Sequence, residues 1–176
     1  MSFQVMLEQL SSGMLKSMSI FFLTLLFSLP LGLIIAFGRM SKNCILRFIT
    51  GAIISVLRGT PLMLQLLVVY FFPYYLFGWS IADWRFPAII VGFSINYAAY
   101  FAEIYRSGIE AIPKGQYEAS QLLNYSKSQN FFRIVFPQVV KIILPAITNE
   151  IITLVKDTSL AFSLSVFYYT TLGSSP

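Results

Sequence analysis

The sequence predicts an all-α membrane protein, a polytopic helical bundle of four apolar segments followed by a partial fifth. Of the 176 residues, 57% are hydrophobic and only 11% are charged. A soluble domain usually carries about 25% charged residues, so this chain has too few to cover a globule in water. Long apolar stretches separated by short polar ones indicate helices that cross a bilayer. Because the chain has no internal repeat or linker, we expect residues 1–176 to form a single transmembrane domain.

The first apolar segment covers residues 18–38 and reads "MSIFFLTLLFSLPLGLIIAFG", without a charged residue. About 20 apolar residues span the core of a bilayer, so this stretch predicts one complete span. Pro30 and Gly32 lie inside it. Both are acceptable in a membrane helix, because neighbouring helices can satisfy the backbone groups that these residues free.

The second and third segments contain informative polar residues. Residues 48–77 are interrupted by "RGTP" at 58–61, and we expect this break to set the start of the second span on the cytoplasmic side. Residues 86–102 form the third segment, in which Ser94 and Asn96 are the polar residues. Two further membrane-spanning helices are therefore predicted.

Charged residues delimit the remaining segments. Glu103, Arg106 and Glu110 follow the third segment at helical spacing, which predicts a ladder of charges that closes the helix end. The fourth segment covers residues 142–155. After "KDTS", residues 160–172 are apolar again and form the partial fifth segment.

Basic residues predict the orientation, because cytoplasmic loops of membrane proteins are enriched in lysine and arginine. The loop after the first segment contains Arg39, Lys42 and Arg47, and the region 106–141 contains Arg106, Lys114, Lys127, Arg133 and Lys141. The N-terminal tail has only Lys16, and the loop after the second segment has only Arg85. The N-terminus is therefore expected outside, with residues 106–141 facing the cytoplasm.

Composition also argues against several classes of function. The chain has no histidine, one cysteine (Cys44) and no G-x-S-x-G motif, so the usual catalytic and metal-binding constellations lack members. Basic residues do not cluster, which argues against nucleic acid as a partner. We therefore expect neither an enzyme nor a metal site.

The stretch "YEASQLLNYSKSQNFFRIVFPQ", residues 117–138, predicts a helix, a tight turn and a second helix. Asn124 stands where the first helix must end, and asparagine can adopt the left-handed conformation of a helix cap. Ser126 and Gln129 have the spacing of a capping box. On spacing alone, two interpretations stay open: a connector on the membrane surface, or a docking element for a soluble partner.

These residues resemble the EAA loop of ABC importer permeases, in which Glu-Ala-Ala is followed by a glycine and later by Ile-x-Leu-Pro. Three further stretches resemble the polar amino-acid uptake branch of that family: "RGTPLMLQ" (58–65), "YAAYFAEIYRSGIEAIPKGQYEA" (97–119) and "LPAITNEIITLVKDTSLA" (144–161). The four matches occur in the family's order and cover most of residues 58–161. The resemblance favours the docking interpretation.

The resemblance implies a type I importer in the bacterial inner membrane. In such a transporter two permease chains, alike or different, form the pore, and an external solute-binding protein delivers the amino acid. ATP is bound by a cytoplasmic ATPase subunit, so this chain is expected to hold no cofactor. The residues implied to couple the permease to that ATPase are Gly115, Tyr117, Glu118, Ala119, Ser120 and Asn124.

The sequence departs from the family pattern at three places. Ser120 replaces an alanine, and Asn124 replaces the glycine of the turn. The family pattern continues with a further span, whereas this chain ends at Pro176, so we expect the final span to be missing. An inactive, truncated permease remnant, or a structural membrane protein without transport activity, is therefore the alternative function.

Polar residues inside the apolar segments are candidates for the substrate path. Lys156 and Asp157 follow a short apolar segment, and either form an ordinary interfacial helix end or line the pore for a zwitterionic ligand. Gln65 and Asn96 either form a hydrogen bond between helices or also belong to the path.

Overall fold

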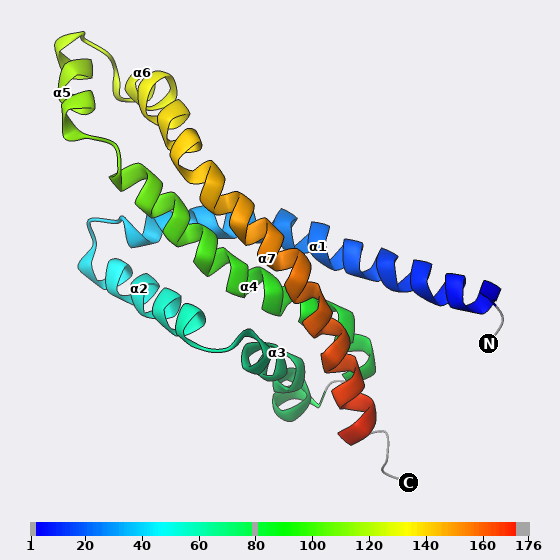
Figure 1. The fold of residues 1–176 in the computed structure, drawn as a ribbon. Helices are drawn as coiled ribbons and strands as arrows, with labels where there is room; N and C mark the ends of the chain where they lie inside the picture. Colours follow the sequence, from blue (N-terminus) through cyan, green and yellow to red (C-terminus); the bar gives the residue numbers. More distant parts are fainter. Residues whose placement is uncertain (1–2, 79–80, 172–176) are drawn as a thin grey trace.

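The computed structural model describes residues 3–78 and 81–171, and its secondary structure over these ranges is helical without any strand (Figure 1). The predicted all-α class is therefore confirmed. Three helices are long and apolar enough to cross a membrane, or four if a bent pair of helices counts as one span. The end of the predicted partial fifth segment, at residue 172, lies outside the described residues.

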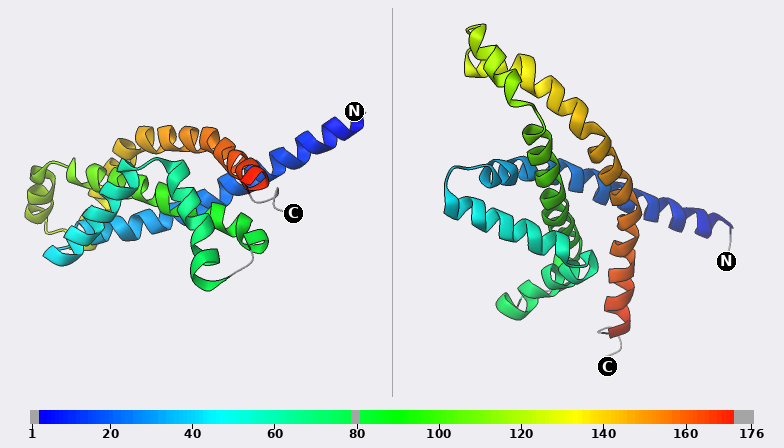
Figure 2. Two further views of the ribbon diagram at one scale, coloured as in Figure 1. Left: turned by 90° about the horizontal axis from the view of Figure 1, so that it is seen from below. Right: turned by 60° about the vertical axis from the view of Figure 1, so that its left-hand side comes forward.

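Helix α1 extends from Phe3 to Arg39, and its apolar part covers Ser11–Arg39. It begins well before the predicted limit at residue 18, because the polar N-terminal residues continue the same helix. Pro30 lies within the helix and does not end it. The N-terminal part of α1 extends away from the other helices (Figures 1 and 2), while its C-terminal part packs on α4.

Helices α2 (Cys44–Gly59) and α3 (Leu62–Phe77) replace the predicted second span. Their axes differ by 110°, and the two helices have 16 residues each. The "RGTP" break interrupts the apolar segment as the sequence predicted, and α3 begins directly after it at Leu62. The sharp angle between the two helices, which makes the break an elbow, was not predicted. Proline at position 61 favours this geometry, since its ring cannot continue a preceding helix but suits the first turn of a new one.

Helix α4 (Ile81–Glu110) is the centre of the bundle and packs against α1, α2, α3 and α7. In the most apolar stretch of α4, 61% of the residues are buried. The corresponding share is 28% in α1 and 11% in the last span, Lys127–Ala161. Phe93, Tyr97 and Phe101 of α4 are almost fully buried and form the main core together with residues of α1, α3 and α7.

The chain continues through α5 (Lys114–Leu122), α6 (Lys127–Asn130), the π-helical turn η1 (Phe131–Val135) and α7 (Phe136–Thr171). The fourth apolar segment and the described part of the predicted fifth lie on α7, which continues through "KDTS" without a break. Polar residues do not interrupt it because the Thr158 and Ser159 hydroxyls donate to the carbonyls of Val155 and Lys156.

Helices α1 and α4 approach closely at Gly32. A Cβ atom at this position would lie 2.9 Å from Cβ of Phe101 and 3.0 Å from the carbonyl oxygen of Ala98. Small residues allow membrane helices to approach closely and to gain dispersion contacts. Glycine at position 32 therefore sets the crossing of α1 over the central helix.

The variant Gly32→Val should destabilise the protein by about 1–3 kcal/mol, the usual cost of overpacking a close contact. Thermal unfolding of the detergent-solubilised protein measures the effect. Gly13→Val is the matched control, since Gly13 lies on the same helix and a Cβ atom at this position would have no neighbouring atom within 4 Å. Equal melting temperatures for the two variants would contradict the assigned role of Gly32.

Candidate functional site

Helix α5 lies at one end of the molecule, beyond the end of α4 (Figures 1 and 2). Gly115, Glu118 and Ala119 are exposed, and a Cβ atom at position 115 would have no neighbouring atom within 4 Å. At the end of the helix, 87% of Leu122 and 66% of Leu123 are exposed. A short helix with exposed leucines at the tip of a membrane protein is suited to contact a partner.

Asn124 ends α5 in the way the sequence predicted. Its φ of 54° lies in the left-handed region, and no other non-glycine residue of the described chain has a positive φ. The Tyr125 N–H donates to the Ser120 carbonyl and the Asn124 N–H donates to the Gln121 carbonyl, both at 3.0 Å. This pair of bonds is a Schellman motif, so the predicted left-handed cap is confirmed.

The predicted capping box at the start of α6 is also confirmed. The Gln129 N–H donates to Ser126 Oγ at 3.2 Å, and the Ser126 N–H donates to Gln129 Oε1 at 2.9 Å. The turn between α5 and α6 is thus fixed from both sides by hydrogen bonds that local sequence determines.

Two of the predicted coupling residues face the protein interior. Ser120 is only 1% exposed, and its hydroxyl donates to the Tyr117 carbonyl at 2.7 Å. Tyr117 is half-buried and packs on the apolar cluster formed by Ile112, Val135 and Val139 with Ile143. These side chains seat α5 on the start of α7, and the exposed face of α5 is formed by other residues.

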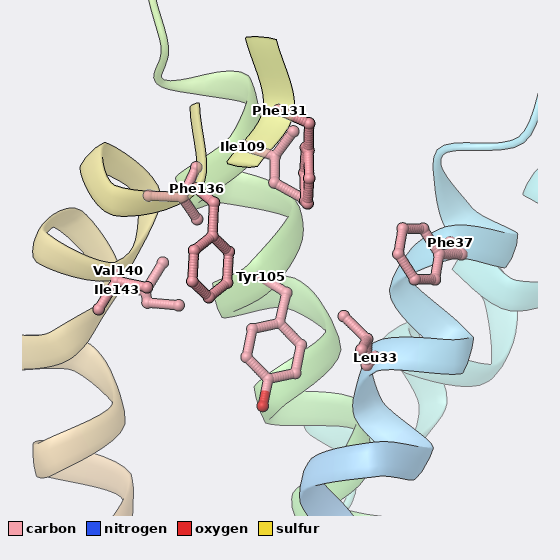
Figure 3. A pocket seen from close by; sticks show the side chains of 9 residues that line it. Leu33, Phe37, Tyr105, Ile109, Phe131, Phe136, Val140 and Ile143 are labelled. Atoms are coloured by element: carbon pink, nitrogen blue, oxygen red, sulfur yellow. The ribbon is translucent and has the colours of Figure 1, made fainter. Parts of the chain in front are cut away.

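An apolar pocket of about 360 Å³ lies between α1, α4 and the beginning of α7 (Figure 3). Its lining residues are Leu33, Phe37, Tyr105, Ile109, Phe131, Phe136, Val139, Val140 and Ile143. The Tyr105 hydroxyl is the one polar side-chain group in this lining. A polar amino acid would lose more hydrogen bonds to water here than one hydroxyl can replace, so the pocket is not suited to such a ligand. It also places the end of α1 at the same end of the bundle as α5.

Gln65 and Asn96 meet at the elbow between α2 and α3. The Gln65 amide donates to the Leu57 carbonyl at 2.7 Å and to Thr60 Oγ1 at 2.7 Å. Asn96 of α4 donates to Gln65 Oε1 at 2.9 Å and to the Leu57 carbonyl at 3.4 Å. We call Leu57, Thr60, Gln65 and Asn96 the elbow cluster. It satisfies carbonyls that the end of α2 leaves unpaired, as a bilayer requires.

Lys156 and Asp157 do not act as a pair. Asp157 faces α4, where its Oδ2 accepts a hydrogen bond of 2.8 Å from the Tyr97 hydroxyl. Lys156 is exposed and forms no ion pair with any residue that the structure describes. Adjacent residues project about 100° apart on a helix, which explains the separation.

The charge ladder at the end of α4 is confirmed. Arg106 forms ion pairs with both Glu103 and Glu110. Nearby, the guanidinium of Arg58 lies 5.1 Å from the ring centre of Tyr100, a cation–π contact that ties the end of α2 to α4.

Sequence reasoning missed the roles of Tyr97, Thr60 and Tyr100. For Tyr97 the sequence offered an indication, since the hydroxyl of a tyrosine buried in an apolar span needs a hydrogen-bond partner. The partner could not be identified, because Asp157 is 60 residues away along the chain. The contacts of Thr60 with Gln65 and of Tyr100 with Arg58 depend on the angle between α2 and α3. The local sequence pattern does not indicate this angle.

Comparison with known proteins adds to this geometry. The family described as binding-protein-dependent transport system inner membrane component matches residues 28–174. The chain is 37% identical over 158 residues to the L-cystine transport system permease protein TcyB of Bacillus subtilis, covering 89% of this chain and 66% of that protein. It is 37% identical over 148 residues to the putative glutamine transport system permease protein GlnP of Rickettsia bellii, covering 84% and 67%. It thus spans about two thirds of these relatives.

Solved structures give a consistent result. The chain matches the crystal structure of an amino acid ABC transporter with histidines at a TM-score of 0.79 and 33% identity, covering 94% of this chain and 77% of that chain. It also matches an inward-facing form of the MetNI methionine ABC transporter at a TM-score of 0.66 and 20% identity, covering 100% and 86%. The second match shows a shared fold.

Replacing Asn96 with leucine should destabilise the protein by about 1–2 kcal/mol, since hydrogen bonds inside membrane proteins contribute about 0.6 kcal/mol on average and the Leu57 carbonyl would also lose a donor. Thermal unfolding in detergent measures this change. Ser94→Ala on the same helix is the control, because the buried Ser94 hydroxyl has no hydrogen-bond partner among the described residues. A variant N96L as stable as S94A would show that the elbow does not depend on Asn96.

Proposed function

This chain belongs to the family of binding-protein-dependent transport system inner membrane components, and from that premise we propose that it is the permease subunit of an ATP-driven importer for polar amino acids. The relatives named above are permeases for cystine and glutamine, which supports an amino acid as the transported solute. The family consists of transport components and not of enzymes.

The observation that carries this proposal is the exposed helix α5, closed by the left-handed cap at Asn124. We assign it as the coupling helix that docks into a cleft of a cytoplasmic ATPase, which would bind the ATP. Gly115, Glu118 and Ala119 supply the exposed surface, with no side chain at position 115 to hold a partner away. Tyr117 and Ser120 support that surface from behind.

The substrate path is assigned to the polar residues of the spans. Lys156 is exposed on the least buried span, where an ammonium group can meet the carboxylate of an amino acid. Gln65, Asn96 and Asp157 are assigned to this path as positioning residues, because each holds two helices together through a hydrogen bond. A second permease chain would complete the pore, and an external solute-binding protein would deliver the amino acid.

We propose that the chain lies in the bacterial inner membrane as one transmembrane domain, with its N-terminus outside. Phe37, Ile109 and Phe131 line one pocket, so the basic loop after α1 and the segment of residues 106–141 lie at the same end of the bundle. Concentration of basic residues at that end supports its cytoplasmic location.

The variant Glu118→Ala should abolish co-purification with the ATPase and reduce amino-acid uptake by about tenfold or more, the effect of losing a well-placed charged contact. Its thermal stability should match that of the wild type, since the Glu118 side chain is exposed and forms no ion pair with the residues that the structure describes. Pull-down from membranes and uptake of radiolabelled glutamine and cystine are the measurements.

Lys127→Ala is the matched control for this experiment, because Lys127 is an exposed charged residue of the same loop that lies outside α5. It should leave ATPase binding unchanged. Normal co-purification of the E118A variant would remove the assignment of α5 as the coupling helix.

The proposed orientation can be tested with cysteine labelling in intact spheroplasts. An impermeant maleimide added from outside should leave the native Cys44 unlabelled, because this exposed residue lies at the start of α2 on the cytoplasmic side. The same reagent should label Gln4→Cys in a Cys44→Ser background, since residue 4 is exposed near the N-terminus. Labelling of Cys44 from outside, with residue 4 protected, would reverse the topology.

A further inference from the structure

The two halves of α7 are attached to α4 in different ways. In the first half, a Cβ atom at Gly108 of α4 would lie 2.1 Å from Cγ2 of Ile143, so the two helices are in close contact. In the second half, the hydrogen bond of 2.8 Å from Tyr97 to Asp157 is the polar link between the helices among the described side chains. Apolar support there comes from Leu154 and Ala161, which are buried in the main core.

The Tyr97 hydroxyl is a hydrogen-bond donor whose position is fixed by the packing around the ring. Tyr97 is 2% exposed, and its ring stacks on Phe93 with the ring centres 6.3 Å apart and the planes inclined by 10°. The position of its hydroxyl is therefore fixed by the core of α4. A carboxylate in a bilayer requires such a donor, because an unpaired charge there is costly.

The bond to Tyr97 also decides which way the neighbouring residue points. With Asp157 held against α4, Lys156 projects away from the core, and its side chain is exposed without an ion pair to any described residue. A rotation of α7 about its axis would break the Tyr97 bond and turn Lys156 at the same time, since adjacent residues are fixed about 100° apart.

We propose that Tyr97 is a positioning residue of the transport path: through Asp157 it seats the second half of α7 on α4, and it thereby presents Lys156 to the carboxylate group of the transported amino acid. This inference rests on the proposed function for the role of Lys156. It assigns Asp157 as an anchor that accepts a hydrogen bond, and not as the group that binds the substrate's ammonium.

The experiment uses the full chain in membrane vesicles with Cys44, the single native cysteine, replaced by serine. Ala161→Cys reports how closely α7 sits on α4, because residue 161 is 5% exposed in the core cluster that contains Tyr97. The probe is a water-soluble methanethiosulfonate reagent, and the measured quantity is the labelling rate of the cysteine.

Tyr97→Phe removes only the hydroxyl and should raise the labelling rate at position 161 by about tenfold, the factor expected for losing a hydrogen bond to a charged group. Asp157→Val should have the same effect. Asp157→Asn keeps an acceptor for Tyr97, so its rate should remain within about twofold of the parent. Tyr105→Phe is the matched control on the same helix, since its hydroxyl forms no hydrogen bond with the described residues, and it should leave the rate unchanged.

A Y97F rate equal to that of Y105F, or a D157N rate as high as that of D157V, would overturn the anchor. The role of Lys156 is tested separately, by measuring the uptake of radiolabelled glutamine and cystine by the assembled transporter. Lys156→Gln should reduce this uptake without changing the rate at position 161, and unchanged uptake would overturn its role. If the labelling pattern is as expected but the parent transports no amino acid, the anchor stands and the proposed function fails.

Discussion

The fold depends on one requirement of the bilayer, that every backbone N–H and C=O group must find a partner inside the protein. An uninterrupted helix meets this requirement with its own backbone hydrogen bonds. The elbow between α2 and α3 departs from that arrangement, because α2 ends within an apolar segment and leaves carbonyls unpaired. Asn96 and Gln65 supply the missing donors, with Asn96 reaching from the central helix. Because of these bonds the chain can turn by 110° and place Leu66 and Tyr70 of α3 in the core. The packing of α3 on α4 then holds the helix in this direction.

The central position of α4 follows from its sequence of small and aromatic residues. Ala98 and Ala102 are fully buried and permit the close approach of α1, while the side chains of Phe93 and Phe101 fill the core. The same helix carries Asn96 for the elbow and Tyr97 for α7. Every other long helix is therefore oriented by α4, which explains why α4 is far more buried than α1 or α7.

Local features of this protein could be predicted from the sequence, and features that depend on distant contacts could not. The caps at Asn124 and Ser126 and the ion pairs of Arg106 involve residues within five positions of each other. The continuity of α7 was missed because "KDTS" looks like the end of a span, although serine and threonine can bond back to their own helix. The inward direction of Ser120 and the partner of Asp157 depend on the packing of α5 and α4, which the local pattern does not specify.

The left-handed residue at position 124 gives α5 a defined length. With nine residues and a rise of about 1.5 Å per residue, the helix is about 13.5 Å long. One additional helical residue would turn the following chain by about 100° and move α6 to another side of α5. An ordinary side chain at position 124 would favour such an extension, because it would resist a φ of 54°. A single asparagine thus fixes the length of the exposed helix and the direction in which the chain continues toward α7.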